Sequence, residues 1–420
     1  MVRRSNHGTE TTVLRKFGIN ETYQLATYLI DQYRGTCLSC RYTIPPRLAP
    51  AESRAQLEEA VKIAVVDIIM RHPMLQVGMM DATSKTPSWI QLQKHDDFEQ
   101  TPGWKMTIFR QGNAPIMEVL LTWNHPQFGG AGAKVFHEDF LEMLNAENGT
   151  YERTGLDIDL KVLAKAFWEE TRPQFLNRDV SWAAWCPIRT SPYKTQYRTF
   201  FMDNASLVAI LARCRQNKTT ITGLLNGLAL IAVSSRLDST VAPAFQSSTI
   251  MDHRWNLPSA LPDAPWVRSD RAVGNYVTQC LHRYDTELLW AVSAQNRQEI
   301  VDKLEAGLRN DLVGLFKYVT DWQKTMSSMA KKTRQFTWLV TNIGALDGNT
   351  STGLSTTTTP SPTGGDSKSD DGQRWSIDRA HVAGQGMCVS ANWPDCAIDE
   401  AFGENIMADL ERWLAQLASL

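Results

Sequence analysis

The sequence has 420 residues, of which 43% are hydrophobic and 21% charged, and its formal net charge is −2. This length exceeds what one hydrophobic core usually serves, so we expect two domains. No run rich in lysine and arginine occurs, which argues against a nucleic-acid-binding surface and against a basic membrane-binding patch. The charged start of the chain is not followed by an apolar stretch, and no window of about eighteen apolar residues exists. We therefore expect neither a secretory signal nor a membrane span, and we expect a cytoplasmic protein.

The first 145 residues alternate amphipathic helices with strands, as judged from the spacing of their apolar residues. Residues 116–124 form a near-continuous apolar run, IMEVLLTWN, which is typical of a buried strand. A short loop, HPQFGG at 125–130, separates this strand from the next helix. The expected helices cover 20–33, 51–71 and 133–145, and the expected strands cover 37–45, 74–79, 89–92 and 116–124.

The remaining residues predict a second unit of the same kind. Residues 150–200 have no clear periodicity, and we interpret them as an irregular crossover. The low-complexity stretch 348–372 is too polar to offset its ordering entropy, which predicts a disordered loop. The expected helices are 204–216, 219–236, most of 285–335 and 400–417, and the expected strands are 247–251, 273–281, 337–342, 375–377 and 386–392.

The cysteines do not predict a metal or redox site. Cys37 and Cys40 have the CxxC spacing, but a zinc site would need a second pair, and Cys388 and Cys396 are poorly spaced for one. The flanks of the CxxC segment are strand-like, whereas a redox motif would lie at a strand-to-helix turn. We interpret these residues as ordinary thiols and expect no metal.

His125 is the residue best placed for chemistry. An imidazole has a pKa near neutrality and can accept a proton at cellular pH, which acyl transfer to an alcohol or amine requires. The end of the 116–124 strand would hold it in place. Gly129 and Gly130 would let backbone and substrate approach closely, and the helix beyond offers amide donors for developing negative charge.

The HPQFGG loop resembles the HxxxDG motif of the chloramphenicol-acetyltransferase-like acyltransferases. This superfamily includes plant BAHD enzymes, trichothecene acetyltransferases, fungal alcohol acetyltransferases and peptide-synthetase condensation domains. His125 and Gly130 match the motif, Gly129 replaces its aspartate, and Asn124 stands where relatives often have a second histidine. The segments that follow the order of fungal alcohol-acetyltransferase-like proteins are FGINETYQLATYLIDQY, CRYTIP, RHPMLQV, TIMDHRWNLP, VGNYV and TNIGALDG.

The resemblance implies an α/β fold with two lobes, each a mixed sheet with flanking helices, and an active-site channel between them. The N-terminal lobe would cover 1–185 and carry His125 as general base, and the C-terminal lobe would cover 186–420. In relatives an arginine at the position of Arg254 pairs with the motif aspartate. Here Arg254 is expected to pair with Asp252 or another acid, or to contact substrate.

Asn275 and Asn342 are two further candidates, because both lie at expected strand ends. Their amides either donate to a thioester or its pantetheine arm, or make ordinary turn hydrogen bonds. The other histidines are less promising: His137 is expected to be partly exposed on its helix, and His72 to fix a turn. The role of His381 stays open.

The resemblance implies an enzyme that esterifies a hydroxyl of a small molecule, such as a fungal secondary metabolite, with acyl-CoA as co-substrate. Attack on the thioester would be direct, without an acyl-enzyme, and no permanently bound cofactor is implied. We expect a monomer. Two alternatives stay open: an acyl carrier protein could supply the acyl group, or the loss of the motif aspartate could mark a protein that binds or cyclises an intermediate without acyl transfer.

Overall fold

The computed structural model describes residues 3–4, 10–33, 35–92, 103–145, 181, 183, 185–186, 193–257, 260–261, 264–284, 288–307, 311–346, 376–379 and 386–420. The predicted crossover therefore lies mostly outside the described residues. The predicted loop at 348–372 and His381 lie wholly outside them. The predicted boundary between residues 185 and 186 stays a prediction.

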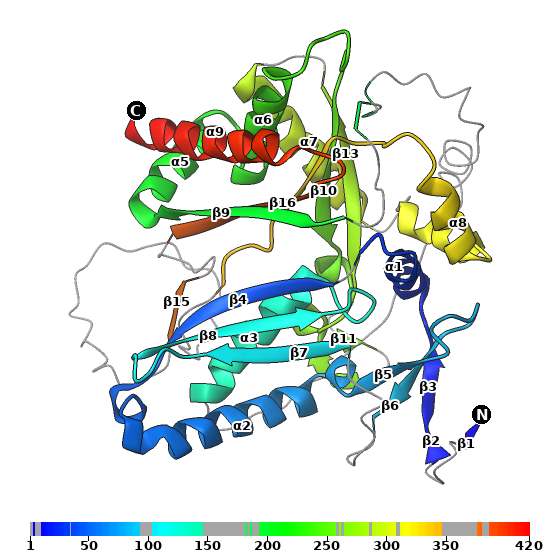
Figure 1. Cartoon of the computed structure of the whole chain (residues 1–420), viewed down its shortest axis with the longest axis vertical. Coiled ribbons are helices and arrows are strands. Elements are labelled where there is room, and N and C mark those ends of the chain that lie inside the picture. The colour runs from blue at the N-terminus through cyan, green and yellow to red at the C-terminus, as the bar shows by residue number, and fades with distance from the viewer. Residues whose placement is uncertain are drawn as a thin grey trace.

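One half of the molecule is built on a four-stranded sheet in the order β15-β4-β8-β7, in which every neighbouring pair is antiparallel. In Figure 1 this sheet crosses the lower half, with α2 beneath it. The buried core joins the sheet to both helices, through Tyr42 and Leu121 of the sheet, Ile68 of α2, and Phe136 and Phe140 of α3. The elements are β4 (Thr36–Thr43), α2 (Arg54–Arg71), β7 (Trp104–Phe109), β8 (Ile116–Trp123), α3 (Gly130–Asn145) and β15 (Ser376–Arg379).

A smaller three-stranded sheet, β3-β6-β5, and helix α1 complete this half. α1 also packs on α8 (Trp322–Met329) and on the 3-10 segment η7 (Leu312–Tyr318) from the second half of the chain. The contact is a cluster around Ala26, Trp322 and Met326. The elements are β1 (Arg3–Arg4), β2 (Glu10–Thr11), β3 (Val13–Lys16), α1 (Ile19–Leu29), η1 (Pro46–Leu48), η2 (Ala51–Ser53), η3 (Pro73–Leu75), β5 (Val77–Met80) and β6 (Ser88–Gln91).

The other half, in the upper part of Figure 1, contains the sheet β13-β10-β14 and the pair β16-β9. α5, α6 and α9 pack against β9 and β16 around Phe200, Leu228 and Leu410. The remaining elements of the chain are β9 (Thr195–Asp203), α5 (Asn204–Gln216), α6 (Ile221–Ser234), β10 (Gln246–Asp252), η5 (Arg254–Asn256), β11 (Ala260–Leu261), β12 (Ala264–Arg268), η6 (Ser269–Arg271), β13 (Val277–Arg283), α7 (Leu289–Ala306), η7 (Leu312–Tyr318), α8 (Trp322–Met329), β14 (Trp338–Thr341), β16 (Gly386–Pro394) and α9 (Glu400–Ser419). Of these, β11 lies in the lower half of Figure 1.

The predicted α/β architecture with two lobes is confirmed, and several details differ. A mixed sheet was predicted for each lobe, but among the described strands only the β13-β10-β14 sheet is mixed, and the sheets of the first half are antiparallel. α3 begins at Gly130 rather than at residue 133, because the amides of Gly132 and Ala133 donate to the Gly129 carbonyl and close an earlier first turn. α1 ends at Leu29 rather than at residue 33, and the chain then turns through Asp31 with a φ of 61°. β9 lies partly in the region predicted to be irregular. Cys37 and Cys40 both lie on β4 as free thiols, as expected.

Candidate active site

The loop that carries His125 is held by hydrogen bonds at both ends. The Asn124 amide donates to the Gly103 carbonyl over 2.7 Å, and the Gln127 amide donates to the Asn124 carbonyl over 3.0 Å. The indole of Trp123, the last residue of β8, donates to the Phe128 carbonyl over 2.7 Å, and the two rings stack with centroids 5.2 Å apart. The loop is therefore folded back onto the strand that precedes it, and it fixes His125 at the strand end.

Asn275, from the other half of the molecule, reaches His125. Its Nδ2 donates to the His125 carbonyl over 2.8 Å and lies 3.2 Å from Nδ1 of the ring. A carbonyl oxygen only accepts hydrogen bonds, so this contact fixes which end of the amide faces His125. The amide oxygen of Asn275 then accepts from Nδ2 of Asn20, in the first turn of α1, over 3.0 Å.

His125 is neutral over the physiological pH range, because burial lowers its pKa to about 4. Nδ1 faces the Asn275 amide, so Nε2 lies on the opposite side of the ring. Tyr33 meets the ring edge-on with centroids 5.4 Å apart. Nε2 is therefore the candidate proton acceptor of the neutral ring.

The glycines of the loop lie against the second half of the chain. The Gly129 amide donates to the Gly274 carbonyl over 3.2 Å. A Cβ at Gly129 would lie 3.0 Å from Cγ1 of Val277 and 3.9 Å from both the amide oxygen of Asn275 and Cε1 of His125. At Gly130 it would lie 3.3 Å from Cγ2 of Ile343. The side of the loop where relatives have an aspartate therefore faces Val277, Asn275 and His125.

Arg254 pairs with Asp252, which is one of the two options left open by the sequence. Its side chain is 4% exposed, donates from Nε to the Ala272 carbonyl over 2.9 Å and from Nη2 to the Gly274 carbonyl over 3.0 Å, and lies over the Tyr276 ring. A Cβ at Gly132, not at Gly129, would meet this guanidinium, at 3.3 Å from Nη2. Arg254 therefore holds backbone of its own half of the chain.

Asn342 makes turn hydrogen bonds. Its Nδ2 donates to the hydroxyl of Thr222 over 3.0 Å, and its Oδ1 accepts from the Gly344 amide over 2.8 Å. Its neighbour Ile343 lies beside Gly130, so the segment is close to the loop although the amide of Asn342 is engaged elsewhere. A contact between Asn342 and substrate stays a prediction.

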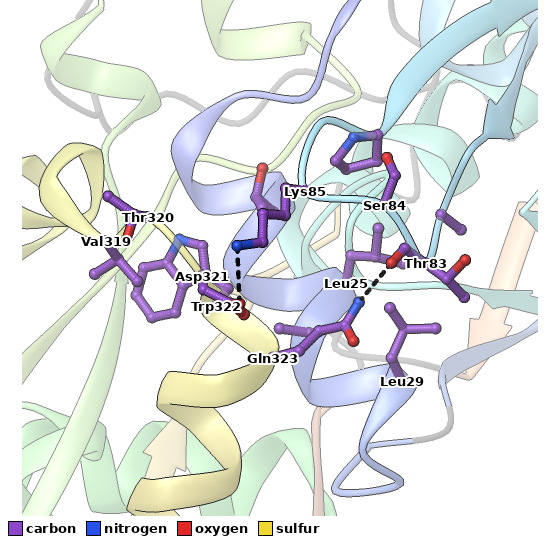
Figure 2. Close-up of a pocket in the computed structure, with 14 residues that line it drawn as sticks. Leu25, Leu29, Thr83, Ser84, Lys85, Val319, Thr320, Asp321, Trp322 and Gln323 are labelled. Carbon is purple, nitrogen blue, oxygen red and sulfur yellow. Dashed lines mark hydrogen bonds and ion pairs between the residues drawn. The ribbon is translucent and has the colours of Figure 1, made fainter.

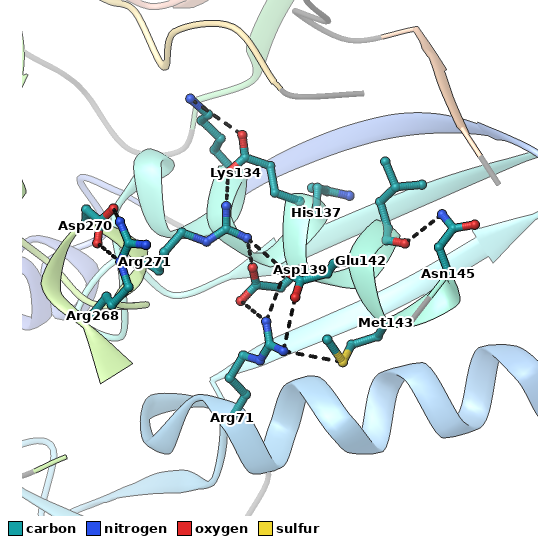
Figure 3. Close-up of polar contacts among 12 residues, drawn as sticks. Arg71, Lys134, His137, Asp139, Glu142, Met143, Asn145, Arg268, Asp270 and Arg271 are labelled. Atoms are coloured by element: carbon teal, nitrogen blue, oxygen red, sulfur yellow. Dashed lines mark hydrogen bonds and ion pairs between the residues drawn. The ribbon is translucent and has the colours of Figure 1, made fainter. Parts of the chain in front are cut away.

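A cluster of charged residues ties α3 to the ends of α2 and η6 (Figure 3). Asp139 is buried; it accepts from Nε2 of His72 over 2.6 Å, pairs with Arg271, and lies 3.6 Å from Arg71. Glu142 accepts from Arg71 over 3.2 Å. Burial, followed by the charges of Arg71 and Arg271, lowers the pKa of His72 to about 3, so it donates to Asp139 as a neutral imidazole.

The prediction that His137 is partly exposed is wrong. Its side chain is fully buried, and the hydroxyl of Tyr42 lies 2.9 Å from its Nδ1. Burial lowers its pKa to about 4. The sequence did not single out Asp139 or Arg271 either. The acidic residues Glu138 and Asp139 beside His137 suggested a solvent-exposed helix surface, but Arg71 and Arg271 pair with them and cover that side of α3.

A cavity of about 150 Å³ lies between α1, the turn 82–87 and the start of α8 (Figure 2). Its apolar floor includes Leu25 and Trp322. Nζ of Lys85 lies 3.6 Å from Asp321, and Nε2 of Gln323 donates to the Thr83 carbonyl over 3.3 Å, so both contacts join the two walls. His125 does not line this cavity, so it is separate from the candidate active site.

The described part of the chain contains neither a membrane-spanning helix nor a cluster of metal-binding side chains. None of its helices combines the length and the apolar character needed to cross a membrane. Within the same residues, no group of three or more His, Cys, Asp or Glu side chains is arranged to hold a metal ion.

The chain is similar to known proteins along nearly its whole length. No protein-family model matches the chain. It is similar to a probable alcohol acetyltransferase of Fusarium pseudograminearum, 22% identical over 488 aligned positions that cover 99% of this chain and 97% of that protein. Two solved structures share the fold: a trichothecene 15-O-acetyltransferase of Fusarium sporotrichioides, with a TM-score of 0.62, 11% identity and coverage of 99% and 98%, and a peptide-synthetase cyclization-docking bidomain of Sorangium cellulosum, with a TM-score of 0.56, 10% identity and coverage of 97% and 87%.

The chain therefore has the two-lobed fold of the chloramphenicol-acetyltransferase-like superfamily, and the resemblance predicted from the sequence is confirmed. The enzyme class predicted from the sequence, an acyltransferase, is confirmed by the similarity to an acetyltransferase along nearly the whole chain.

Proposed function

We propose that this protein transfers an acyl group from acyl-CoA to a hydroxyl of a small molecule, with His125 as general base. The observation that carries the proposal is the neutral imidazole at the end of β8. Asn275 lies against Nδ1 and donates to the His125 carbonyl, so we assign the role of base to Nε2, on the other side of the ring. Removal of Nε2 basicity should therefore remove most of the rate.

The proposed step needs no acyl-enzyme. The acceptor hydroxyl gives its proton to Nε2 of His125 as its oxygen attacks the thioester carbonyl. When the tetrahedral intermediate collapses, the carbon–sulfur bond breaks and the thiolate of CoA takes the proton back from Nε2. The base is then regenerated, and the products are an ester and free CoA. A base positioned in this way contributes about 10²–10⁴-fold to the rate.

The first turn of α3 acts mainly on the loop itself. The amides of Gly132 and Ala133 both donate to the Gly129 carbonyl, over 2.9 and 3.2 Å. These two donors therefore close the turn after His125 and do not serve as an oxyanion hole. The positive end of the helix still lies beside the loop and favours negative charge there by about 0.3–1 kcal/mol.

The proposed substrates follow from the relatives. One similar protein carries the name alcohol acetyltransferase, and the solved enzyme with the same fold is a 15-O-acetyltransferase of a trichothecene. We therefore propose acetyl-CoA as donor and an alcohol of secondary metabolism as acceptor. No permanently bound cofactor has a part in this scheme. We propose that the enzyme acts in the cytoplasm as a monomer.

A second candidate is favoured by one observation: the loop has Gly129 in place of an aspartate, and the fold is shared with a cyclization domain of a peptide synthetase. On this alternative the protein takes its acyl group from a carrier protein, or binds or cyclises an intermediate without acyl transfer. Asn124, Gly129, Gly130 and Asn342 would then line a site for a different ligand.

Thioester consumption separates these functions. Purified protein is given acetyl-CoA or an acetylated acyl carrier protein, each with a panel of alcohols, and released thiol and ester product are measured. We expect thiol release from acetyl-CoA to depend on both an alcohol and His125, as tested with His125→Gln. Turnover of the carrier-bound thioester alone would move the donor to a carrier protein, and consumption of neither thioester would favour the binding or cyclising alternative.

A further inference from the structure

Asn275 lies at the end of a short segment that is held at several points. Arg271, at the start of this segment, pairs with the buried Asp139 of α3. The carbonyls of Ala272 and Gly274 both accept from the guanidinium of Arg254, and Gly274 also accepts from the Gly129 amide. The backbone on which Asn275 stands is therefore fixed to the His125 loop and to α3.

The side chain of Arg254 can hold this backbone segment in place because its guanidinium is buried and donates to nearby acceptors. It is 4% exposed, and burial of an unpaired charge would be costly. Its partners are the carboxylate of Asp252 and two backbone carbonyls, and hydrogen bonds of charged groups are stronger than those between neutral groups. These three partners bond three different nitrogens of the planar guanidinium, a geometry that the single nitrogen of a lysine does not reproduce.

The side chain of Asn275 is held from another direction. Asn20 donates to the Asn275 amide oxygen, which leaves the Asn275 Nδ2 group directed at the His125 carbonyl. Asn20 lies in the first turn of α1, whose N-cap is Gly18, whereas Arg254 lies at the end of β10. Two parts of the chain that are distant in sequence thus converge on one amide.

We propose that Arg254 and Asn20 are positioning residues for His125, acting through Asn275, and that they hold the His125 loop in place of the aspartate that Gly129 replaces. Arg254 sets the position of the Asn275 backbone, and Asn20 sets the orientation of its amide. Neither residue touches the reacting atoms. The kinetic part of this inference rests on the proposed function, and the structural part does not.

The kinetic test uses Arg254→Lys, Asn20→Ala and Asn275→Ala, singly and with Asn275→Ala added to each of the others. Misplacement of a catalytic group by about 1 Å costs about 100-fold, so we expect each single variant to lower kcat by about 10- to 100-fold while KM for acetyl-CoA is retained. Because the three residues act through one contact, the double variants should lose no more than Asn275→Ala alone. Losses that multiply would overturn the proposal.

Two matched control variants separate positioning from a general loss of structure. Arg236 also donates to a backbone carbonyl, that of Ala232 over 2.8 Å, and pairs with an aspartate, Asp409, but it has no contact with the Asn275 segment. Asn217 donates to the Arg213 carbonyl at the end of α5. Arg236→Lys and Asn217→Ala should leave kcat unchanged, and an equal loss of kcat in these controls would overturn the proposal.

The tautomer of His125 provides a readout that does not require activity. Nitrogen-15 NMR of histidine-labelled protein, with the His125 signal assigned by His125→Gln, reports which ring nitrogen is protonated. We expect a single tautomer in the wild type and a mixture of tautomers in Asn20→Ala and Arg254→Lys. An unchanged tautomer and an unchanged kcat in both variants would overturn the proposal. A changed tautomer in a protein that consumes no thioester would support the positioning role and refute the proposed function.

Discussion

Three buried histidines make the stability of this protein sensitive to mild acid. Burial lowers the pKa of His72 to about 3 and that of His125 and His137 to about 4. In the unfolded chain each imidazole has a pKa of about 6.5. Above this value both states are neutral. As the pH falls below about 6.5, the three imidazoles become protonated in the unfolded chain but stay neutral in the native protein. The free energy of unfolding therefore decreases until the pH reaches the native pKa values.

The size of this effect follows from the three shifts. One proton per pH unit corresponds to about 1.4 kcal/mol, so three histidines together lower the free energy of unfolding by about 4 kcal/mol per pH unit between about pH 6 and 5. Such a loss is a large part of the 5–15 kcal/mol that is typical of folded proteins. Carboxylates stay mostly ionised above pH 5 and contribute little to this window.

Urea denaturation at pH 7.5, 6.0 and 5.0 measures the effect, with fluorescence of the tryptophans as the signal. We expect a midpoint that is lower at pH 6.0 than at pH 7.5 and lowest at pH 5.0. His125→Gln removes one of the three groups and should reduce the slope by about one third, or about 1.4 kcal/mol per pH unit. A free energy of unfolding that is constant or rises between pH 6.0 and 5.0 would refute the assignment of three neutral buried imidazoles.

Two further predictions concern the charge cluster and the loop. Asp139→Asn removes the buried partner of the Arg271 guanidinium and should lower the free energy of unfolding by about 3–5 kcal/mol. Asp270→Asn is the control, because Asp270 forms an exposed pair with Arg268, and it should cost less than about 1 kcal/mol. Equal effects of the two variants in urea denaturation would contradict the burial argument. Gly129→Asp crowds Val277 and places a carboxylate beside His125, so it should cost about 1–3 kcal/mol of stability and lower kcat relative to Gly129→Ala; a higher kcat would show that the loop tolerates the acid.

The position of His125 could be predicted from the sequence because its determinants are local. The apolar run that forms β8 and the glycines after it are adjacent in the chain, and the structure has the strand, loop and helix in that order. We expected the helix to begin three residues later, because glycine has a low helix propensity. It begins at Gly130 because hydrogen bonds to the Gly129 carbonyl close the first turn there.

β9 could not be predicted because its residues do not alternate clearly between apolar and polar. Its outward residues include the exposed Tyr197 and Phe201, while its inward residues include Arg198, which pairs with Glu404 and Glu411 of α9. Apolar side chains on the solvent face and a charged one beneath the helices hide the period of two that marks a half-buried strand. A partner helix two hundred residues later in the chain determines this pattern, and the sequence alone does not reveal it.

The role of Asn275 beside His125 was also beyond local reasoning. The sequence places this asparagine near a strand end and leaves its partner open, because 150 residues separate it from His125 and 255 separate it from Asn20. The same holds for Arg254, whose two carbonyl partners lie 18 and 20 residues further along the chain. The Asn275 contacts depend on how the two halves meet, and the Arg254 contacts depend on how the chain folds back after β10; no local pattern encodes either.

The central claim is that His125 removes the proton from an acceptor alcohol. The most direct test is kcat/KM of His125→Gln against wild type in the release of CoA from acetyl-CoA with an alcohol acceptor, on proteins with the same melting temperature. The account predicts a fall of about 10²–10⁴-fold, as expected for loss of a general base. A variant that retains activity within a few-fold of wild type would contradict it.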